Sequence, residues 1–361
     1  MALEAAVGLI DRGIHVTVVL PVDGPLRDEL RAAGAEVVIH DVPVLRKSAM
    51  KPGGFVRLVR DLVLRGPRMA AALRRTRPDL VYVNTIVQPW WALAARLARK
   101  KVVVHVREAE VDPPAVVRRA LLSPLLLAHS VIANSRFTER QILRDCPGVR
   151  SRTRVIYNGK DWSSYVVAHE ASQEGVFRVL YLGRLSPRKG TDVAVRAVAL
   201  LRETGVDARL TLAGAVFPGY EWYERDLTTL ADELGLDAGV LTFTGFVSRT
   251  QELFSTADAL VVPSRAEPFG TVAAEGLAAG VPVVVSDVQG LVEIVTDGED
   301  GLVVPPDDPD ALASALRTLA DDPLAGATLV EKGRRSVHER FSRERYRAAI
   351  ANEIQRVGES R

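Results

Sequence analysis

The feature that most constrains the fold of this sequence is a series of short apolar runs that alternate with segments of helical length. Continuous apolar strands between helices are typical of parallel sheets covered on both faces, and two successive series indicate two such sheets. The pattern therefore predicts an α/β protein of two doubly wound, Rossmann-like domains that face a cleft. The runs are His15–Leu20, Glu36–His40, Leu80–Asn84, Val102–Val106, Ser130–Asn134 and Arg154–Tyr157, then Phe177–Leu182, Arg209–Ala213, Leu241–Phe243, Ala259–Val262, Val281–Val285 and Leu302–Val304.

The polar stretch Asp161–Gly175 separates the two series. It predicts a first domain at 1–165 and a second at 166–341, followed by a C-terminal helix at 342–361 that packs back across the cleft. The chain opens on a helical segment, Ala2–Leu9, whereas a doubly wound domain normally starts with a strand and a glycine-rich turn. We therefore expect the first strand of the N-terminal domain to be missing.

Composition limits the cellular setting of the chain. Its 361 residues are 47% hydrophobic and 25% charged, as in soluble globular proteins. The single cysteine, Cys146, excludes an internal disulfide. Neither a leader-like N-terminus nor an apolar run of about 20 residues is visible. We expect a cytoplasmic protein, attached at most to the inner face of the plasma membrane.

Positive charge is concentrated in the first half of the chain. Residues 1–170 carry a net charge of +11, and the remainder carries −9. Residues 46–77 hold ten basic residues and one acid, together with apolar residues such as Phe55 and Leu62. This segment can bind an anionic membrane surface, or it can be a core-packed helix with a solvated basic face. No nucleic-acid-binding motif is present, so we expect no nucleic-acid partner.

The segment from Glu267 to Glu275, Glu-Pro-Phe-Gly-Thr-Val-Ala-Ala-Glu, indicates a ligand site. Pro268 disfavours a helical Glu267, which places that carboxylate in a loop at the carboxyl edge of the second sheet, where such folds bind ligands. A helix is expected from about Gly270 to Ala279. The backbone amides of Phe269, Gly270 and Thr271 at its start can bind an anion. Glu275, further along this helix, can accept hydrogen bonds from a ribose diol.

Two other turns fall at the same sheet edge. Gly183-Arg-Leu-Ser-Pro-Arg-Lys-Gly190 follows the run Phe177–Leu182, and its Arg184 and Lys189 can bind phosphate oxygens without a metal. Alone, this turn is equally well explained as solvated basic residues. Thr244-Gly-Phe-Val247 follows the run ending at Phe243, and its backbone can approach a nucleobase, although a plain structural turn also explains it.

In this order and spacing, these motifs resemble the retaining GT-B glycosyltransferases of family 4, also called glycosyl transferases group 1. The resemblance is good from about Phe177 to Ala320 and looser before it. It implies that Gly183, Arg184 and Lys189 hold the donor diphosphate and that Glu275 binds the ribose. Glu267 would contact the donor sugar, aided by the amides of Phe269 and Gly270. The family's glycine-rich loop after the first strand is not found in this sequence.

The remaining site residues implied by the resemblance are in both halves. Phe246 and Val247 would border the base, and His105, at the end of its strand, would lie near the donor sugar as a catalytic residue. A structural histidine is the alternative. Ser135 is more simply a helix cap. Asp308 and Asp310 are spaced like a metal-binding pair but begin a helix, so we expect capping and no metal.

These residues and the resemblance together predict a metal-independent hexosyltransferase that uses no cofactor. Its substrates would be a UDP- or GDP-linked sugar and a glycan or lipid-linked acceptor, with retention of configuration, in the synthesis of cell-envelope polysaccharide or glycolipid. The alternatives are a non-catalytic sugar-nucleotide-binding protein and another GT-B enzyme such as an epimerase.

Overall fold

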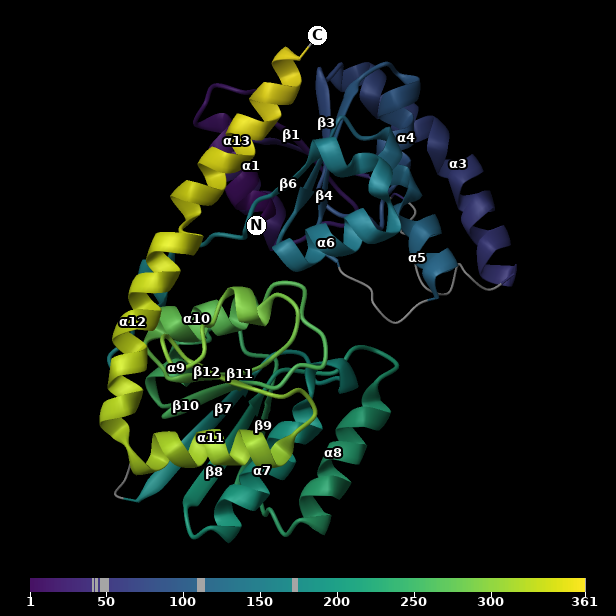
Figure 1. The fold of residues 1–361 in the computed structure, drawn as a ribbon. Helices are drawn as coiled ribbons and strands as arrows, with labels where there is room; N and C mark the ends of the chain where they lie inside the picture. The colour runs from purple at the N-terminus through teal and green to yellow at the C-terminus, as the bar shows by residue number, and fades with distance from the viewer. Residues whose placement is uncertain (41, 43–44, 46–51, 109–113, 171–174, 361) are drawn as a thin grey trace. The chain divides into compact units, whose positions relative to one another are not determined.

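The computed structural model describes residues 1–40, 42, 45, 52–108, 114–170 and 175–360 (Figure 1). The chain divides into two compact units. The first contains Met1–Lys160 together with Arg343–Arg361, and the second contains Asp161–Ser342. The C-terminal helix α13 thus belongs to the first unit.

The first unit alternates strands and helices, as the apolar runs predict. Its strands are β1 Thr17–Leu20, β2 Glu36–Ile39, β3 Leu80–Val83, β4 Lys101–Val106, β5 Ser130–Ala133 and β6 Thr153–Val155. Its helices are α1 Ala2–Ile10, α2 Pro25–Ala32, α3 Pro52–Thr76, α4 Trp90–Leu97, α5 Ala115–Leu122, α6 Arg136–Asp145 and α13 Arg343–Glu359.

All strand pairs of this unit are parallel, and they form two separate sheets. One has the order β3-β4-β5-β6, and the other is the pair β1-β2. In the described residues no strand joins β1 to β3. Side chains of β4 alternate between two cores: Val102 and Val104 pack with α4, whereas Val103 packs with α1 and α13. Figure 1 shows α1 and α13 side by side.

The second unit holds one six-stranded parallel sheet with the order β12-β11-β10-β7-β8-β9. Its strands are β7 Val176–Leu182, β8 Asp207–Ala213, β9 Leu241–Gly245, β10 Ala259–Val262, β11 Val283–Ser286 and β12 Leu302–Val304. Its helices are α7 Thr191–Glu203, α8 Glu221–Glu233, α9 Gln251–Ser255, α10 Thr271–Ala279, α11 Pro309–Asp321 and α12 Pro323–Phe341. All twelve predicted strands are confirmed to within a few residues.

Helices cover both faces of this sheet. α7 packs against α8 and α11 on one face, and α10 packs against α12 on the other (Figure 1). The main core lies under α7, where Val195, Ala197 and Leu201 are fully buried against β8. The strand order reverses between β7 and β10, so the loops that follow these two strands meet at the switch point where open α/β sheets bind ligands.

The basic segment 46–77 is only partly described. Residues 46–51 lie outside the described residues, as do most side chains from 52 to 65. In the later turns of α3, Met69 and Leu73 are buried in the core while Arg68, Arg74 and Arg75 are exposed. Among the residues that the structure describes, no helix is long and apolar enough to cross a lipid bilayer.

Candidate active site

The loop after β7 and the loop after β10 fit closely against each other in the second unit. Gly190 has a φ of 66°, and a Cβ there would lie 1.8 Å from the Pro263 carbonyl oxygen. The backbone N–H of Arg265 donates to the Arg188 carbonyl at 2.9 Å, and Arg188 Nη1 donates back to the Ala266 carbonyl at 2.9 Å. Only glycine allows this approach at position 190, and the two loops therefore form one surface.

This surface brings Lys189 and Glu267 together. The Lys189 ammonium forms an ion pair with the Glu267 carboxylate, and both side chains are more than four-fifths buried. The two residues are 78 positions apart in the sequence. A cation and a carboxylate thus share one place at the sheet edge, as the sequence motifs predict.

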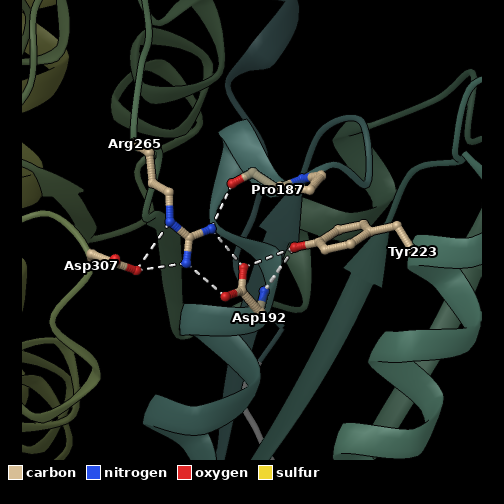
Figure 2. Close-up of polar contacts among 5 residues, drawn as sticks. All are labelled: Pro187, Asp192, Tyr223, Arg265 and Asp307. Atoms are coloured by element: carbon tan, nitrogen blue, oxygen red, sulfur yellow. Dashed lines mark hydrogen bonds and ion pairs between the residues drawn. The ribbon is translucent and has the colours of Figure 1, made fainter. Parts of the chain in front are cut away.

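Arg265 connects this surface to two further elements (Figure 2). Its guanidinium forms a bidentate ion pair with Asp192 in the first turn of α7, at 2.8 and 2.6 Å. It also donates to Asp307, in the loop after β12, and to the Pro187 carbonyl. Burial favours a raised pKa for Asp192, but hydrogen bonds from Arg265 and Tyr223 prevail and lower it. Sequence reasoning missed this cluster.

Helix α10 starts with an N-terminus that no side chain of the described residues caps. Gly270 precedes it with a φ of 99°, and a Cβ there would lie 2.5 Å from a Leu291 methyl carbon. The Phe269 side chain is buried edge-on against Phe341, so only its backbone can take part in a site. Thr271 is the first helical residue. The predicted helix from about Gly270 to Ala279 is confirmed.

Glu275 is buried in the second turn of α10. The Tyr165 hydroxyl donates a hydrogen bond to Glu275 Oε1 at 3.1 Å. Tyr165 belongs to the 3-10 helix Trp162–Tyr165, which is anchored by a 2.7 Å bond from Trp162 Nε1 to the Phe341 carbonyl. The Tyr165 hydroxyl therefore helps to orient the Glu275 carboxylate. The sequence carried no signal for this partner.

Arg184 stands on an aromatic ring at the same sheet edge. Its guanidinium carbon lies 3.2 Å from the centroid of the Phe217 ring, in the loop after β8. The backbones of the two loops also approach closely, because a Cβ on Gly214 would lie 1.8 Å from the Gly183 carbonyl oxygen. The cation–π contact holds the guanidinium at the edge while leaving its N–H groups for a ligand.

The turn after β9 is shorter than the sequence predicts. β9 continues to Gly245, with a register shift between Leu212 and Ala213 on β8, so Thr244 and Gly245 belong to the strand. Phe246 is 82% exposed, and Val247 is half-buried. An aromatic ring exposed to this degree is available to stack on a planar ligand.

His105 lies inside the first unit. Its imidazole is fully buried between the Tyr82 and Tyr346 rings, and Nδ1 is 2.6 Å from the Tyr82 hydroxyl. Burial, aided by the charges of Arg107 and the N-terminus, holds its pKa well below the ordinary value. The His105 imidazole is therefore neutral and shielded from solvent in this structure. Its catalytic role stays a prediction.

Arg107 is a polar residue of the first unit that sequence reasoning did not assign. It lies just after β4 and is half-buried. Its guanidinium donates to Asn84 Oδ1 at 2.8 Å, to Asn158 Oδ1 at 2.7 Å and to the Tyr346 hydroxyl at 2.7 Å. Asn84 and Asn158 follow β3 and β6, so Arg107 joins the carboxyl ends of three strands.

Two capping predictions are confirmed. The Ser135 hydroxyl accepts the N–H of Thr138 at 3.0 Å, and Asp308 Oδ1 accepts the N–H of Ala311 at 2.9 Å. In the described part of the chain, no group of three or more His, Cys, Asp or Glu side chains is arranged to hold a metal ion.

A separate cavity of 430 Å³ lies against β7, β8 and β9, lined by residues such as Arg178, Thr211 and Thr242.

Two parallel-sheet units with such a cluster at a switch point define a class, the nucleotide-binding α/β proteins. Family models identify the chain more closely. The model described as "Glycosyltransferase Family 4" matches residues 1–163, and the one described as "Glycosyl transferases group 1" matches residues 167–336. Together they cover nearly the whole chain, which belongs to the group 1 glycosyltransferases of family 4.

Curated relatives match part of their length. Glycogen synthase of Mycobacterium tuberculosis is 37% identical over 181 residues, which cover 50% of this chain and 42% of that protein. D-inositol 3-phosphate glycosyltransferase of Streptomyces avermitilis is 32% identical over 237 residues, which cover 61% of this chain and 51% of that protein. The chain spans about half the length of the curated relatives it matches.

Solved structures share the fold of the whole chain. HepE of Anabaena, in complex with UDP and glucose, has a TM-score of 0.81 at 24% identity, with 100% of this chain and 95% of that one covered. Sucrose-phosphate synthase of Thermosynechococcus elongatus has a TM-score of 0.77 at 24% identity, with coverage of 99% and 90%. The architecture of this chain is therefore GT-B.

Proposed function

We propose that this protein transfers a hexosyl group from a nucleoside-diphosphate donor to a glycan or lipid-linked acceptor, with retention of configuration and without a metal or cofactor. The observation that carries the proposal is the cluster at the carboxyl edge of the second sheet. There the Lys189–Glu267 pair is in the loops that precede α7 and α10, and Glu275 is on α10.

The chemistry of the transfer follows from these groups. Arg184 and Lys189 neutralise the diphosphate as it leaves, and the amides of Gly270 and Thr271 add oriented dipoles. Lys189 exchanges part of its pairing with Glu267 for the diphosphate, which leaves the Glu267 carboxylate for the donor sugar. Glu275, oriented by Tyr165, binds the ribose diol. We assign no nucleophile.

The nature of the donor and the site of action belong to the same proposal. A UDP- or GDP-linked sugar is supported by HepE of Anabaena, whose structure was solved in complex with UDP-glucose. Synthesis of a cell-envelope polysaccharide or glycolipid at the inner face of the plasma membrane is supported by the exposed arginines of α3, Arg68, Arg74 and Arg75.

A panel of nucleotide sugars tests the proposal. Calorimetry measures binding of each donor, and a coupled assay measures release of nucleoside diphosphate with cell-derived lipid and glycan acceptors. Proton NMR of the product reports the anomeric configuration, and EDTA should leave the rate unchanged. Binding without release would instead identify a non-catalytic nucleotide-sugar-binding protein, and binding of no donor would refute the proposed function altogether.

A further inference from the structure

Arg265 uses every hydrogen-bond donor that its side chain has. Nε donates to Asp307 Oδ1 at 3.0 Å, and Nη2 donates to the same oxygen and to Asp192 Oδ2, each at 2.6 Å. Nη1 donates to Asp192 Oδ1 at 2.8 Å and to the Pro187 carbonyl at 2.6 Å. A guanidinium has five N–H groups in a fixed plane, so the four partner oxygens also define that plane.

The partners of Arg265 come from separate segments at the carboxyl edge of the sheet (Figure 2). Pro187 is in the loop after β7, Asp192 in the first turn of α7, and Asp307 in the loop after β12, while Arg265 itself follows β10. The Tyr223 hydroxyl, from α8, donates to Asp192 at 2.8 Å and fixes that carboxylate from the other side. Arg265 therefore ties three loops of this edge together.

Lys189 and Glu267 lie within two or three residues of these contacts in the sequence. Lys189 is between Pro187 and Asp192 in the chain, and Glu267 is two residues after Arg265. We propose that Arg265 is a positioning residue that sets Lys189 opposite Glu267 so that both face the donor diphosphate and sugar. The inference rests on the proposed function, because it concerns the same site.

Local geometry explains why arginine is needed here. The Arg265 side chain is about one-third exposed, and it lies at the sheet edge outside the buried residues of the main core. Its loss therefore leaves the core packing in place. A lysine keeps the positive charge but is a point donor that cannot reach the Pro187 carbonyl and both carboxylates in one plane. Arg265→Lys should thus loosen the loops more than it destabilises the unit.

Calorimetric titration of the full chain with UDP, GDP, ADP and dTDP provides the test. With the diphosphate that binds best, we expect Arg265→Lys to weaken affinity about tenfold. Lys189→Met should weaken it by at least as much, and the double variant should be no weaker than Lys189→Met alone, because Arg265 acts through Lys189. Arg317→Lys, in the exposed pair with Asp321 on α11, is the matched control and should not change affinity.

The outcomes separate the inference from the proposed function. Unchanged affinity for Arg265→Lys, or an additive loss in the double variant, overturns the positioning role and leaves the proposed function intact. A wild-type chain that binds none of the diphosphates refutes both. If Arg265→Lys melts more than a few degrees lower, Asp307→Gly takes its place. Asp307 is largely exposed and has a φ of 62°, which glycine adopts freely, and its loss removes only one acceptor of Arg265. This variant should weaken affinity about threefold, and wild-type affinity would contradict the inference.

Discussion

Removing the Arg184 guanidinium should weaken binding of the nucleoside diphosphate with little effect on folding. The side chain is exposed, and its one described partner is the Phe217 ring, 3.2 Å from the guanidinium carbon. A hydrogen bond to a charged group contributes about 1.5–3 kcal/mol, so Arg184→Ala should raise the Kd of the diphosphate about 10- to 150-fold. Arg184→Ala should weaken binding of the nucleoside far less than binding of the diphosphate, because the nucleoside alone has no phosphate for Arg184 to contact.

Calorimetry with the diphosphate and with the matching nucleoside separates the contribution of the phosphates to binding from that of the nucleoside. Arg184→Lys keeps the charge but not the forked pair of donors. It should therefore lose about half of the binding free energy that Arg184→Ala loses. Phe217→Leu removes the ring that supports the guanidinium and should cost about 0.5–1 kcal/mol. Arg196→Ala, on the exposed face of α7, is the control. A Kd for Arg184→Ala equal to that of the control would show that Arg184 is not a diphosphate ligand.

Three further predictions concern stability. His105 stays neutral in the folded chain but protonates in the unfolded chain, so stability should fall as the pH drops below about 6.5; a His105→Gln variant that melts with the same pH slope would contradict this. Trp162→Phe should cost about 2 kcal/mol by thermal melting, because the Phe341 carbonyl loses its donor, whereas the half-exposed Trp222→Phe should cost far less. Gly190→Ala should lower both the melting temperature and the diphosphate affinity, because its Cβ would clash with the Pro263 carbonyl. Gly205 has a φ of 93° and open space around it, so Gly205→Ala should lower only the melting temperature, through about 1 kcal/mol of backbone strain. Equal effects of the two variants would exclude the Pro263 clash.

Much of the fold could be predicted because short stretches of sequence specify its strands and helix ends. Apolar runs such as Ala259–Val262 are long enough to specify buried strands, and Gly280, with a φ of 80°, ends α10 where the sequence places its C-terminus. β9 extends beyond its predicted end at Phe243 because pairing with β8 through a shifted register overrides the local turn residues.

The candidate site could be predicted only in part. The sequence predicts that Glu267 and Lys189 lie at the same edge of the sheet because each follows a strand, and their ion pair confirms this placement. The neighbouring Arg265 cluster could not be predicted from the sequence, because Arg265, Asp192 and Asp307 are brought together by tertiary packing. The buried Phe269 ring illustrates the same limit, since one residue supplies both a core side chain and a backbone amide.

A crystal structure of the protein with the nucleoside diphosphate that it binds would test the central claim most directly. We expect phosphate oxygens within hydrogen-bonding distance of Lys189 Nζ and of the first amides of α10, and the ribose hydroxyls on Glu275. Density for the nucleotide elsewhere, for example in the cavity against β7, β8 and β9, would contradict the assignment of this edge as the donor site.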